Sequence, residues 1–123
     1  NASPDSMKAA ISVLKAAEGR RRIAVLGDMF EMGELAEDFH TRIGMFAASQ
    51  GIDILMTTGE NAAYICRGAE PLMGSGRCRH FTQKEDLMKE LEQILKPEDT
   101  VLVKGSRGMH MEEVVEFIQK NRS

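Results

Sequence analysis

The 123-residue sequence contains no tryptophan and only 5% aromatic residues, although 42% of its residues are hydrophobic. Nine methionines accompany the aliphatic side chains. Methionine is unbranched and flexible, so it fills irregular gaps in a core that has few rigid rings. We therefore expect a core of aliphatic and methionine side chains in an otherwise ordinary globular composition.

Cysteine and long apolar runs are also scarce. Cys66 and Cys78 form no C-x-x-C pair and have no nearby set of histidine and cysteine ligands, so neither a zinc site nor a disulfide framework is indicated. No apolar run approaches the roughly 18 residues of a membrane-spanning helix, and no signal peptide opens the chain. These absences predict a cytoplasmic protein with reduced thiols and no membrane insertion.

An excess of basic residues is missing as well. Sixteen Lys and Arg residues stand against 19 Asp and Glu residues, which gives a net charge of -3. Nucleic-acid-binding domains normally show a basic face and a positive balance, so this class is excluded. The one basic run, Arg20 to Arg22, lies between a predicted helix and an apolar segment and is interpreted as a solvated loop.

Short apolar runs alternate with segments of helical periodicity along the whole chain. Strands are expected at Arg22 to Asp28, Asp53 to Gly59, Cys78 to Phe81 and Thr100 to Gly105. Helices are expected from Ser3 to Gly19, from Ala36 to Gln50, from Asn61 to Ala69, after Thr82 and after Gly108. Such alternation requires right-handed crossovers between parallel strands. The prediction is a single domain, residues 1–123, with a Rossmann-like three-layer α/β fold and a mostly parallel sheet of at least four strands.

Local signals refine these helices. Ser3 is suited to cap a helix whose first residue is Pro4, and Thr82 with Glu85 forms a possible capping box. The stretch Pro71 to Gly76 is rich in proline and glycine and is predicted to be a loop. The buried stripe of the second helix is predicted to comprise Leu35, Phe39, Ile43 and Phe46.

In open α/β sheets, ligands bind beyond the carboxyl ends of the strands. The loop after the first strand contains neither a G-x-G-x-x-G fingerprint nor a G-x-x-x-x-G-K-[ST] phosphate loop. It does place three carboxylates, Asp28, Glu31 and Glu34, close together in sequence. That spacing suits a cation or an ammonium group, but it suits a solvated acidic loop equally well.

The loop after the last strand reads Lys104-Gly105-Ser106-Arg107-Gly108. Its glycines allow successive N–H groups to converge, and a helix that followed directly would present its positive end. Ser106 can donate a hydroxyl, while Lys104 and Arg107 add positive charge. Residue chemistry alone therefore permits two interpretations, an anion-binding loop or a glycine-punctuated turn with solvated basic side chains.

Three stretches together resemble one known family. "NASPDSM" (Asn1 to Met7), "VLGDMFEMGE" (Val25 to Glu34) followed by His40, and "VLVKGSRGMHME" (Val101 to Glu112) are similar to the C-terminal domain of the bacterial Mur ligases. The match is to the MurF-type members, and it covers the whole chain. Relatives often carry Asn where Ser3 stands, and Asp-Asp-Tyr usually precedes their first motif. Because the chain opens at Asn1 without an initiator methionine, it is expected to be a fragment.

The resemblance implies a three-domain amide ligase of cytoplasmic peptidoglycan synthesis that depends on ATP and magnesium. In this family ATP phosphorylates the terminal carboxylate of a UDP-N-acetylmuramoyl-tripeptide, and the amine of D-alanyl-D-alanine attacks the acyl phosphate. ATP and Mg²⁺ are bound mainly by the central domain, while the C-terminal domain closes over ATP and helps to seat the dipeptide. The fragment alone is expected to hold no catalytic residue or metal site and to be inactive.

The resemblance also assigns expected roles to individual residues. Gly105, Ser106 and Arg107, with Lys104 beside them, are expected to bind the dipeptide carboxylate or to help close on phosphate. Asp28 and His40 are expected to orient the dipeptide, and Asn1 and Ser3 to lie near the nucleotide. The alternative class is a self-contained binding or receiver-like signalling module. Thr57-Thr58-Gly59 and Phe81-Thr82 lack the phosphoacceptor aspartate that a receiver needs.

Overall fold

A computed structural model describes residues 2–74 and 76–122, with Arg122 described by its backbone alone. The strands are β1 (Arg21–Gly27), β2 (Ile54–Thr58), β3 (Cys78–Phe81) and β4 (Asp99–Lys104). The helices are α1 (Pro4–Ala16), α2 (Ala36–Ser49), α3 (Ala63–Met73), α4 (Lys84–Ile94) and α5 (Glu112–Arg122), and two 3-10 turns are η1 (Gly33–Leu35) and η2 (Arg107–Met109).

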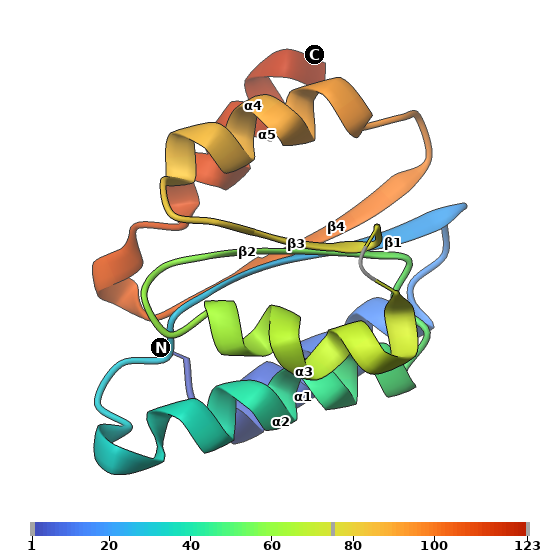
Figure 1. Cartoon of the computed structure of the whole chain (residues 1–123). Helices are drawn as coiled ribbons and strands as arrows, with labels where there is room; N and C mark the ends of the chain where they lie inside the picture. Colours follow the sequence, from blue (N-terminus) through green and yellow to red (C-terminus); the bar gives the residue numbers. More distant parts are fainter. Residues whose placement is uncertain (1, 75, 123) are drawn as a thin grey trace.

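The strands form one parallel sheet in the order β3-β2-β1-β4. Helices α1, α2 and α3 cover one face of this sheet, and α4 and α5 cover the other (Figure 1). The predicted Rossmann-like three-layer α/β fold with at least four strands is thus confirmed. None of the helices in the described ranges combines the length and apolar character needed to cross a membrane.

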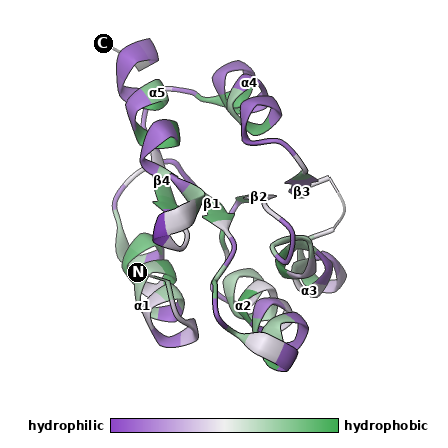
Figure 2. Ribbon diagram, turned by 90° about the vertical axis from the view of Figure 1, so that its left-hand side faces the viewer, coloured by the Kyte–Doolittle hydropathy of each residue, from purple (hydrophilic) through white to green (hydrophobic). Residues whose placement is uncertain are grey.

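The core lies on both faces of β1, whose residues Ile23 to Gly27 are all buried. Ala24 and Leu26 pack with α1, α2 and α3, whereas Ile23 and Val25 pack with α4 and α5. Because successive strand residues point to opposite faces, this continuous apolar run is what a strand covered by helices on both sides requires. Figure 2 shows the hydrophobic colouring concentrated where helices face the sheet.

Helices α2 and α3 approach each other unusually closely through two glycines. A Cβ atom on Gly44 would overlap the backbone carbonyl of Ile65, and one on Gly68 would overlap that of Thr41. Backbone atoms cannot move aside as a side chain can. These glycines are therefore present because the two helices leave no room for a methyl group.

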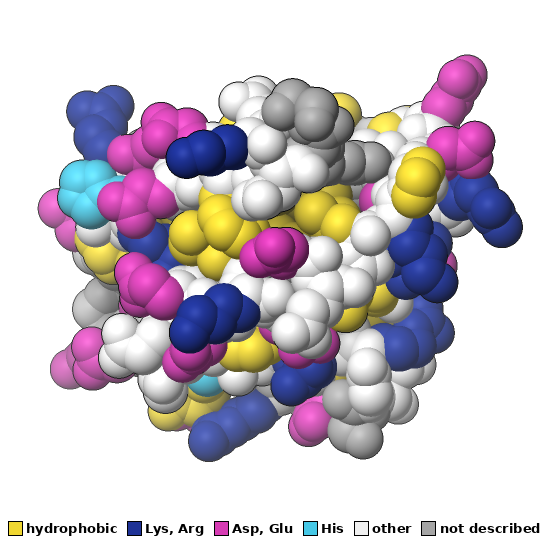
Figure 3. Space-filling view, turned by 90° about the horizontal axis from the view of Figure 1, so that it is seen from above, with side chains coloured by type: hydrophobic (Ala, Val, Ile, Leu, Met, Phe, Trp, Pro, Cys, Tyr) yellow, Lys and Arg dark blue, Asp and Glu magenta, His cyan; other side chains and the backbone are white. Residues whose placement is uncertain are grey.

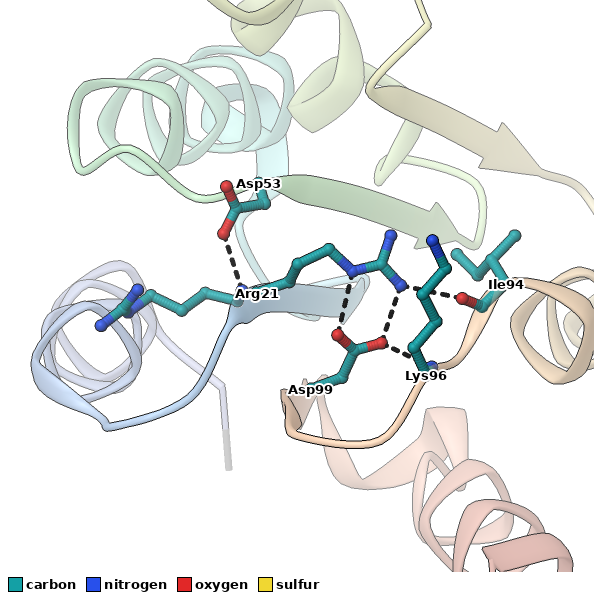
Figure 4. Close-up of polar contacts among 6 residues, drawn as sticks. Arg21, Asp53, Ile94, Lys96 and Asp99 are labelled. Atoms are coloured by element: carbon teal, nitrogen blue, oxygen red, sulfur yellow. Dashed lines mark hydrogen bonds and ion pairs between the residues drawn. The ribbon is translucent and has the colours of Figure 1, made fainter.

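At the amino end of the sheet, a buried carboxylate joins β1 to β4 (Figure 4). Asp99 accepts hydrogen bonds from Nε and Nη2 of Arg21 at 2.9 and 2.7 Å and from the N–H of Lys96 at 2.8 Å. The hydrogen bond with Asp99 raises the pKa of Arg21, which favours the charged guanidinium. On the face formed by α4 and α5, basic and acidic side chains are interspersed, as the net charge of -3 suggests (Figure 3).

The N-terminal cap was predicted correctly. The Ser3 hydroxyl accepts from the N–H of Ser6, the Ser6 hydroxyl accepts from the N–H of Ser3, and Pro4 opens α1. This reciprocal pair forms a capping box that satisfies two N–H groups at the helix end.

Four local predictions were wrong. The run Arg20 to Arg22 is not a solvated loop, because Arg21 and Arg22 are the first residues of β1 and Arg21 binds the buried Asp99. Pro71 lies inside α3, where it removes only one hydrogen bond, to the exposed residue Arg67 near the end of the helix. Thr82 and Glu85 form no capping box, because α4 begins one residue later with Gln83 as its N-cap. Leu35 does not belong to the buried stripe of α2, since η1 turns its side chain outward and leaves it 55% exposed.

Replacing Gly44 by alanine tests the close packing of α2 and α3. The gain in helix propensity, about 1 kcal/mol, is smaller than the cost of overlap with backbone, so we expect a net loss of roughly 2 kcal/mol. The free energy of unfolding from denaturant titration measures this loss. Gly76→Ala is the control, because a Cβ there meets nothing within 4 Å. Equal stability of the two variants would contradict the packing argument.

Candidate functional site

Parallel strands bring four loops to the carboxyl edge of the sheet. These are the segments 28–35 after β1, 59–62 after β2, 82–83 after β3 and 105–111 after β4. The chain leaves β1 toward α2 on one face and leaves β4 toward α5 on the other (Figure 1). The crevice between β1 and β4 is therefore the topological switch point, where open α/β sheets bind ligands.

Ser106 fastens the β4 loop to the β1 loop across this crevice. Its N–H donates to the carbonyl of Asp28 at 2.9 Å, and its hydroxyl oxygen accepts from the N–H of Phe30 at 2.8 Å. Only 2% of the Ser106 surface is exposed. The hydroxyl that was expected to face an anion is thus used, in this structure, to hold two loops together.

Asp28 continues the connection from the β1 loop to the β2 loop. Its carboxylate accepts from the N–H groups of Glu60 at 3.0 Å and Ala62 at 2.6 Å, and the residue is 4% exposed. Gly59 has φ +126, and a Cβ there would overlap the Asp28 carboxylate. A glycine is therefore required at the turn that wraps around this buried charge.

His40 anchors the β1 loop to helix α2. The fully buried imidazole accepts at Nε2 from the N–H of Met29 at 2.9 Å, and Nδ1 lies 2.6 Å from the carbonyl of Ala36. A carbonyl can only accept, so Nδ1 carries the proton and donates it. Both ring nitrogens are occupied by the backbone, and the ring presents no free edge to solvent.

The groups that do reach the solvent at this edge are basic and apolar. Arg107 is exposed in η2, Lys104 is partly buried as the last residue of β4, and Phe30 is 43% exposed. The ring of Phe30 packs against Gly108, and a Cβ on Gly108 would lie 2.5 Å from that ring. Gly105 is similarly crowded, because a Cβ there would lie 2.9 Å from the Met111 side chain. A guanidinium beside an exposed aromatic ring can bind a carboxylate or phosphate that carries a small apolar group.

The expectation that a helix end follows the loop directly was wrong. Turn η2, which contains Gly108, and the left-handed residue His110 (φ 53) lie between Ser106 and α5, which begins only at Glu112. The first turn of α5 carries Glu112 and Glu113, whose charges oppose an anion. Any anion at this loop would therefore be held by the loop itself.

A cation site is not supported by the residues that the structure describes. Asp28 is buried against N–H groups while Glu31 and Glu34 are exposed, and no group of three His, Cys, Asp or Glu side chains within residues 2–74 and 76–122 could hold a metal ion. Of the two residues expected near the nucleotide, Asn1 lies outside the described residues. Ser3 caps α1 at this end of the molecule.

Sequence reasoning missed two features of this edge. Lys84 Nζ donates to the carbonyls of Met109 and His110, and a lysine at the first position of a helix, unfavourable for the helix dipole, could have signalled this. Thr57 and His80 form a hydrogen bond of 2.8 Å between the ends of β2 and β3. Burial lowers the pKa of His80, which favours its uncharged form.

Comparisons with known proteins agree with this geometry. The family described as "Mur ligase, glutamate ligase domain" matches residues 1–107. A UDP-N-acetylmuramoyl-tripeptide–D-alanyl-D-alanine ligase from Bacillus subtilis is 41% identical over 116 residues, which cover 94% of this chain and 25% of that protein. The ligase of the same name from Escherichia coli is 37% identical over 123 residues, covering 98% of this chain and 26% of that protein.

Solved structures show the same likeness. MurF from Acinetobacter baumannii superposes with a TM-score of 0.87 at 28% identity, over 98% of this chain and 26% of that one. MurF from Thermotoga maritima, solved in complex with ADP, gives a TM-score of 0.78 at 27% identity, over 98% and 26%. The chain thus spans about a quarter of the length of these relatives.

The resemblance to Mur ligases noted from the sequence is confirmed by the family match, the sequence relatives and the solved structures, and the receiver-like alternative is not favoured. The matching stretch begins at residue 1 and includes β1, β4 and the Ser106 connection between them. This chain belongs to the family of Mur ligase, glutamate ligase domains.

Proposed function

We propose that this chain is the C-terminal domain of a MurF-type ligase, which joins D-alanyl-D-alanine to a UDP-N-acetylmuramoyl-tripeptide in cytoplasmic peptidoglycan precursor synthesis. The observation that carries the proposal is the likeness to enzymes of that name, which extends over 94% of the chain at 41% identity. The partners would be these two substrates, ATP, and the N-terminal and central domains of the same enzyme.

ATP would supply the phosphoryl group that activates the tripeptide carboxylate. Mg²⁺ would be bound elsewhere in the enzyme, since the described residues provide no cluster of ligands for it. Isolated from those domains, the chain would be inactive. The contribution of this domain would be to hold the dipeptide in line with the reacting carboxyl group and to close over the site.

Within this function we assign the anion contact to Arg107, with Lys104 and the backbone of Gly105 beside it. Arg107 is exposed at the switch-point edge, and its guanidinium can bind a carboxylate through two parallel hydrogen bonds. Its neighbour Ser106 is buried and hydrogen-bonded to Asp28 and Phe30. The carboxylate of D-alanyl-D-alanine is the anion that the dipeptide offers, and its methyl groups match the exposed ring of Phe30.

Asp28, His40 and Ser106 are proposed to act by positioning. Their polar atoms bond the backbone of the loops after β1, β2 and β4, and all three residues are buried. Direct contact of these three with the dipeptide stays a prediction, and their contacts favour the indirect role. Proximity of Asn1 and Ser3 to the nucleotide likewise stays a prediction.

Arg107→Ala in the complete enzyme tests the anion contact. A charge-assisted hydrogen bond contributes roughly 1.5–3 kcal/mol, so we expect the KM for D-alanyl-D-alanine to rise about 10-fold to 100-fold. Thermal stability should not change, because Arg107 is exposed. Steady-state kinetics with dipeptide and ATP varied separately measure the effect. Arg42→Ala, which removes an exposed ion pair on α2, is the control. Wild-type KM values for both substrates in Arg107→Ala would remove this loop from the binding site.

Ser106→Ala should behave differently. It leaves the partly buried N–H of Phe30 without its acceptor, which costs about 1 kcal/mol of stability. We therefore expect a lower unfolding temperature together with a higher KM for the dipeptide, because the loop that carries Arg107 loses its anchor. Thermal unfolding and kinetics on one preparation separate the two effects. A variant with raised KM and unchanged stability would show that the hydroxyl contacts substrate instead.

Asp28→Asn tests the positioning role of the buried carboxylate. Asparagine keeps one acceptor oxygen and turns an NH₂ group toward the second N–H donor, so we expect a loss of about 2 kcal/mol in the free energy of unfolding. Turnover at subsaturating dipeptide should fall as well. Glu31→Gln, an exposed carboxylate in the same loop, serves as the control. Unaltered stability and turnover would remove Asp28 from the site.

A further inference from the structure

Among the described residues of α4, Lys84 is the one whose side chain hydrogen-bonds the 105–111 loop. Its Nζ donates to the carbonyl of Met109 at 3.0 Å and to that of His110 at 3.2 Å, and it pairs with Glu113 Oε1 at 2.6 Å. The Lys84 side chain is 16% exposed, so these contacts are made largely out of solvent. One ammonium group thus joins α4, the end of η2 and the first turn of α5.

The position of Lys84 is unfavourable for α4 itself. It is the first residue of the helix, where the helix dipole disfavours a positive charge and the following Glu85 and Asp86 are the favourable residues. A lysine there weakens the helix end unless its charge is used elsewhere. The three partners of the Lys84 ammonium group all lie in the segment that follows β4, so its charge stabilises that segment and not the end of α4.

The backbone that Lys84 holds is conformationally unfavourable. His110 has φ 53 and ψ 45, a left-handed conformation that side-chain-bearing residues seldom adopt. Its imidazole is exposed and lies 3.4 Å from the equally exposed carboxylate of Glu112, so this contact holds the backbone only weakly. The two hydrogen bonds from Lys84, to the carbonyls of Met109 and His110 that flank the His110 Cα, hold the backbone instead. They complete a turn in which the N–H of His110 donates to the carbonyl of Arg107.

Arg107 therefore lies between two anchors. On one side Ser106 is bonded to Asp28 and Phe30, and on the other side Lys84 holds residues 109 and 110. We propose that Lys84 is a positioning residue, which fixes η2 so that Arg107 faces the dipeptide carboxylate; this inference rests on the proposed function. Lys84 does not itself contact the anion, because its three donors are directed to two carbonyls and a carboxylate.

The test compares Lys84→Met and Lys84→Arg in the complete enzyme. Methionine keeps the length of the side chain and removes the donors, so we expect the KM for D-alanyl-D-alanine to rise about tenfold, within the range that misplacing a binding group produces. The turnover number at saturating dipeptide and the KM for ATP should stay within about twofold. Arginine restores charge and donors and should recover most of the dipeptide affinity. Lys89→Met, an exposed lysine on the same helix, is the control.

A double variant shows whether Lys84 acts through Arg107. If it does, Lys84→Met in the Arg107→Ala background should raise the KM no further, because the positioned group is already absent. An additional tenfold increase in the double variant would overturn the proposal and indicate that Lys84 touches substrate directly. A merely structural role predicts a lower unfolding temperature with an unchanged KM in Lys84→Met, and that result would also overturn it.

These outcomes separate failure of the inference from failure of the proposed function. If Arg107→Ala raises the KM and Lys84→Met does not, the proposed anion contact stands and Lys84 has no positioning role. If neither single variant changes the KM for the dipeptide, the anion contact itself is wrong and the inference falls with it.

Discussion

The hydrogen bonds that hold the loop after β4 to the loop after β1 are the constraint on which this edge of the molecule depends. The two strands are neighbours in the sheet, yet the chain leaves them toward opposite faces (Figure 1). Nothing in the sheet itself keeps the two following loops together. Ser106 does so with its backbone N–H and its hydroxyl oxygen, and Asp28 and His40 extend the same set of tethers to the loop after β2 and to α2.

Burial separates the residues that hold this edge from those that can bind a ligand. A buried polar group costs free energy unless its hydrogen bonds are made, and Asp28, His40 and Ser106 make theirs with backbone of the protein. Their bonding capacity is therefore used within the fold. Arg107 and Phe30 stay exposed on a fixed frame, and a fixed frame reduces the ordering cost when a ligand binds.

The fold could be predicted from the sequence because its signals are local. The run Ile23 to Gly27 is apolar at every position, which indicates a strand covered on both faces, and Ser3 with Pro4 marks a helix start. The misassigned ends at Pro71 and Thr82 differ from the structure by a few residues or less, since helix ends depend on hydrogen bonds that composition does not specify.

The sequence predicts which loops meet at the carboxyl edge of the sheet, but it does not predict what their polar side chains bind there. The rule for parallel sheets selects the loops after β1 and β4, which the structure does bring together, and two of the three motifs that carry the family resemblance extend into them. The donors to Asp28, however, are N–H groups more than 30 residues away in sequence. A sequence shows that a loop contains an aspartate or a serine, but it does not show whether tertiary structure turns that side chain inward.

A methionine side chain also helps to hold turn η2 against the sheet. A Cβ on Gly27 or on Gly59 would lie 3.1 Å from Met109 Cε, so the Met109 side chain extends over the end of β1 and the turn after β2. Turn η2 is thus held by Met109 packing on the sheet and by Lys84 from α4. Moving Arg107 relative to the sheet must disrupt one of these contacts or the Ser106 bonds. The loop should therefore travel with the domain as one rigid body, which is what a domain that closes over a substrate requires.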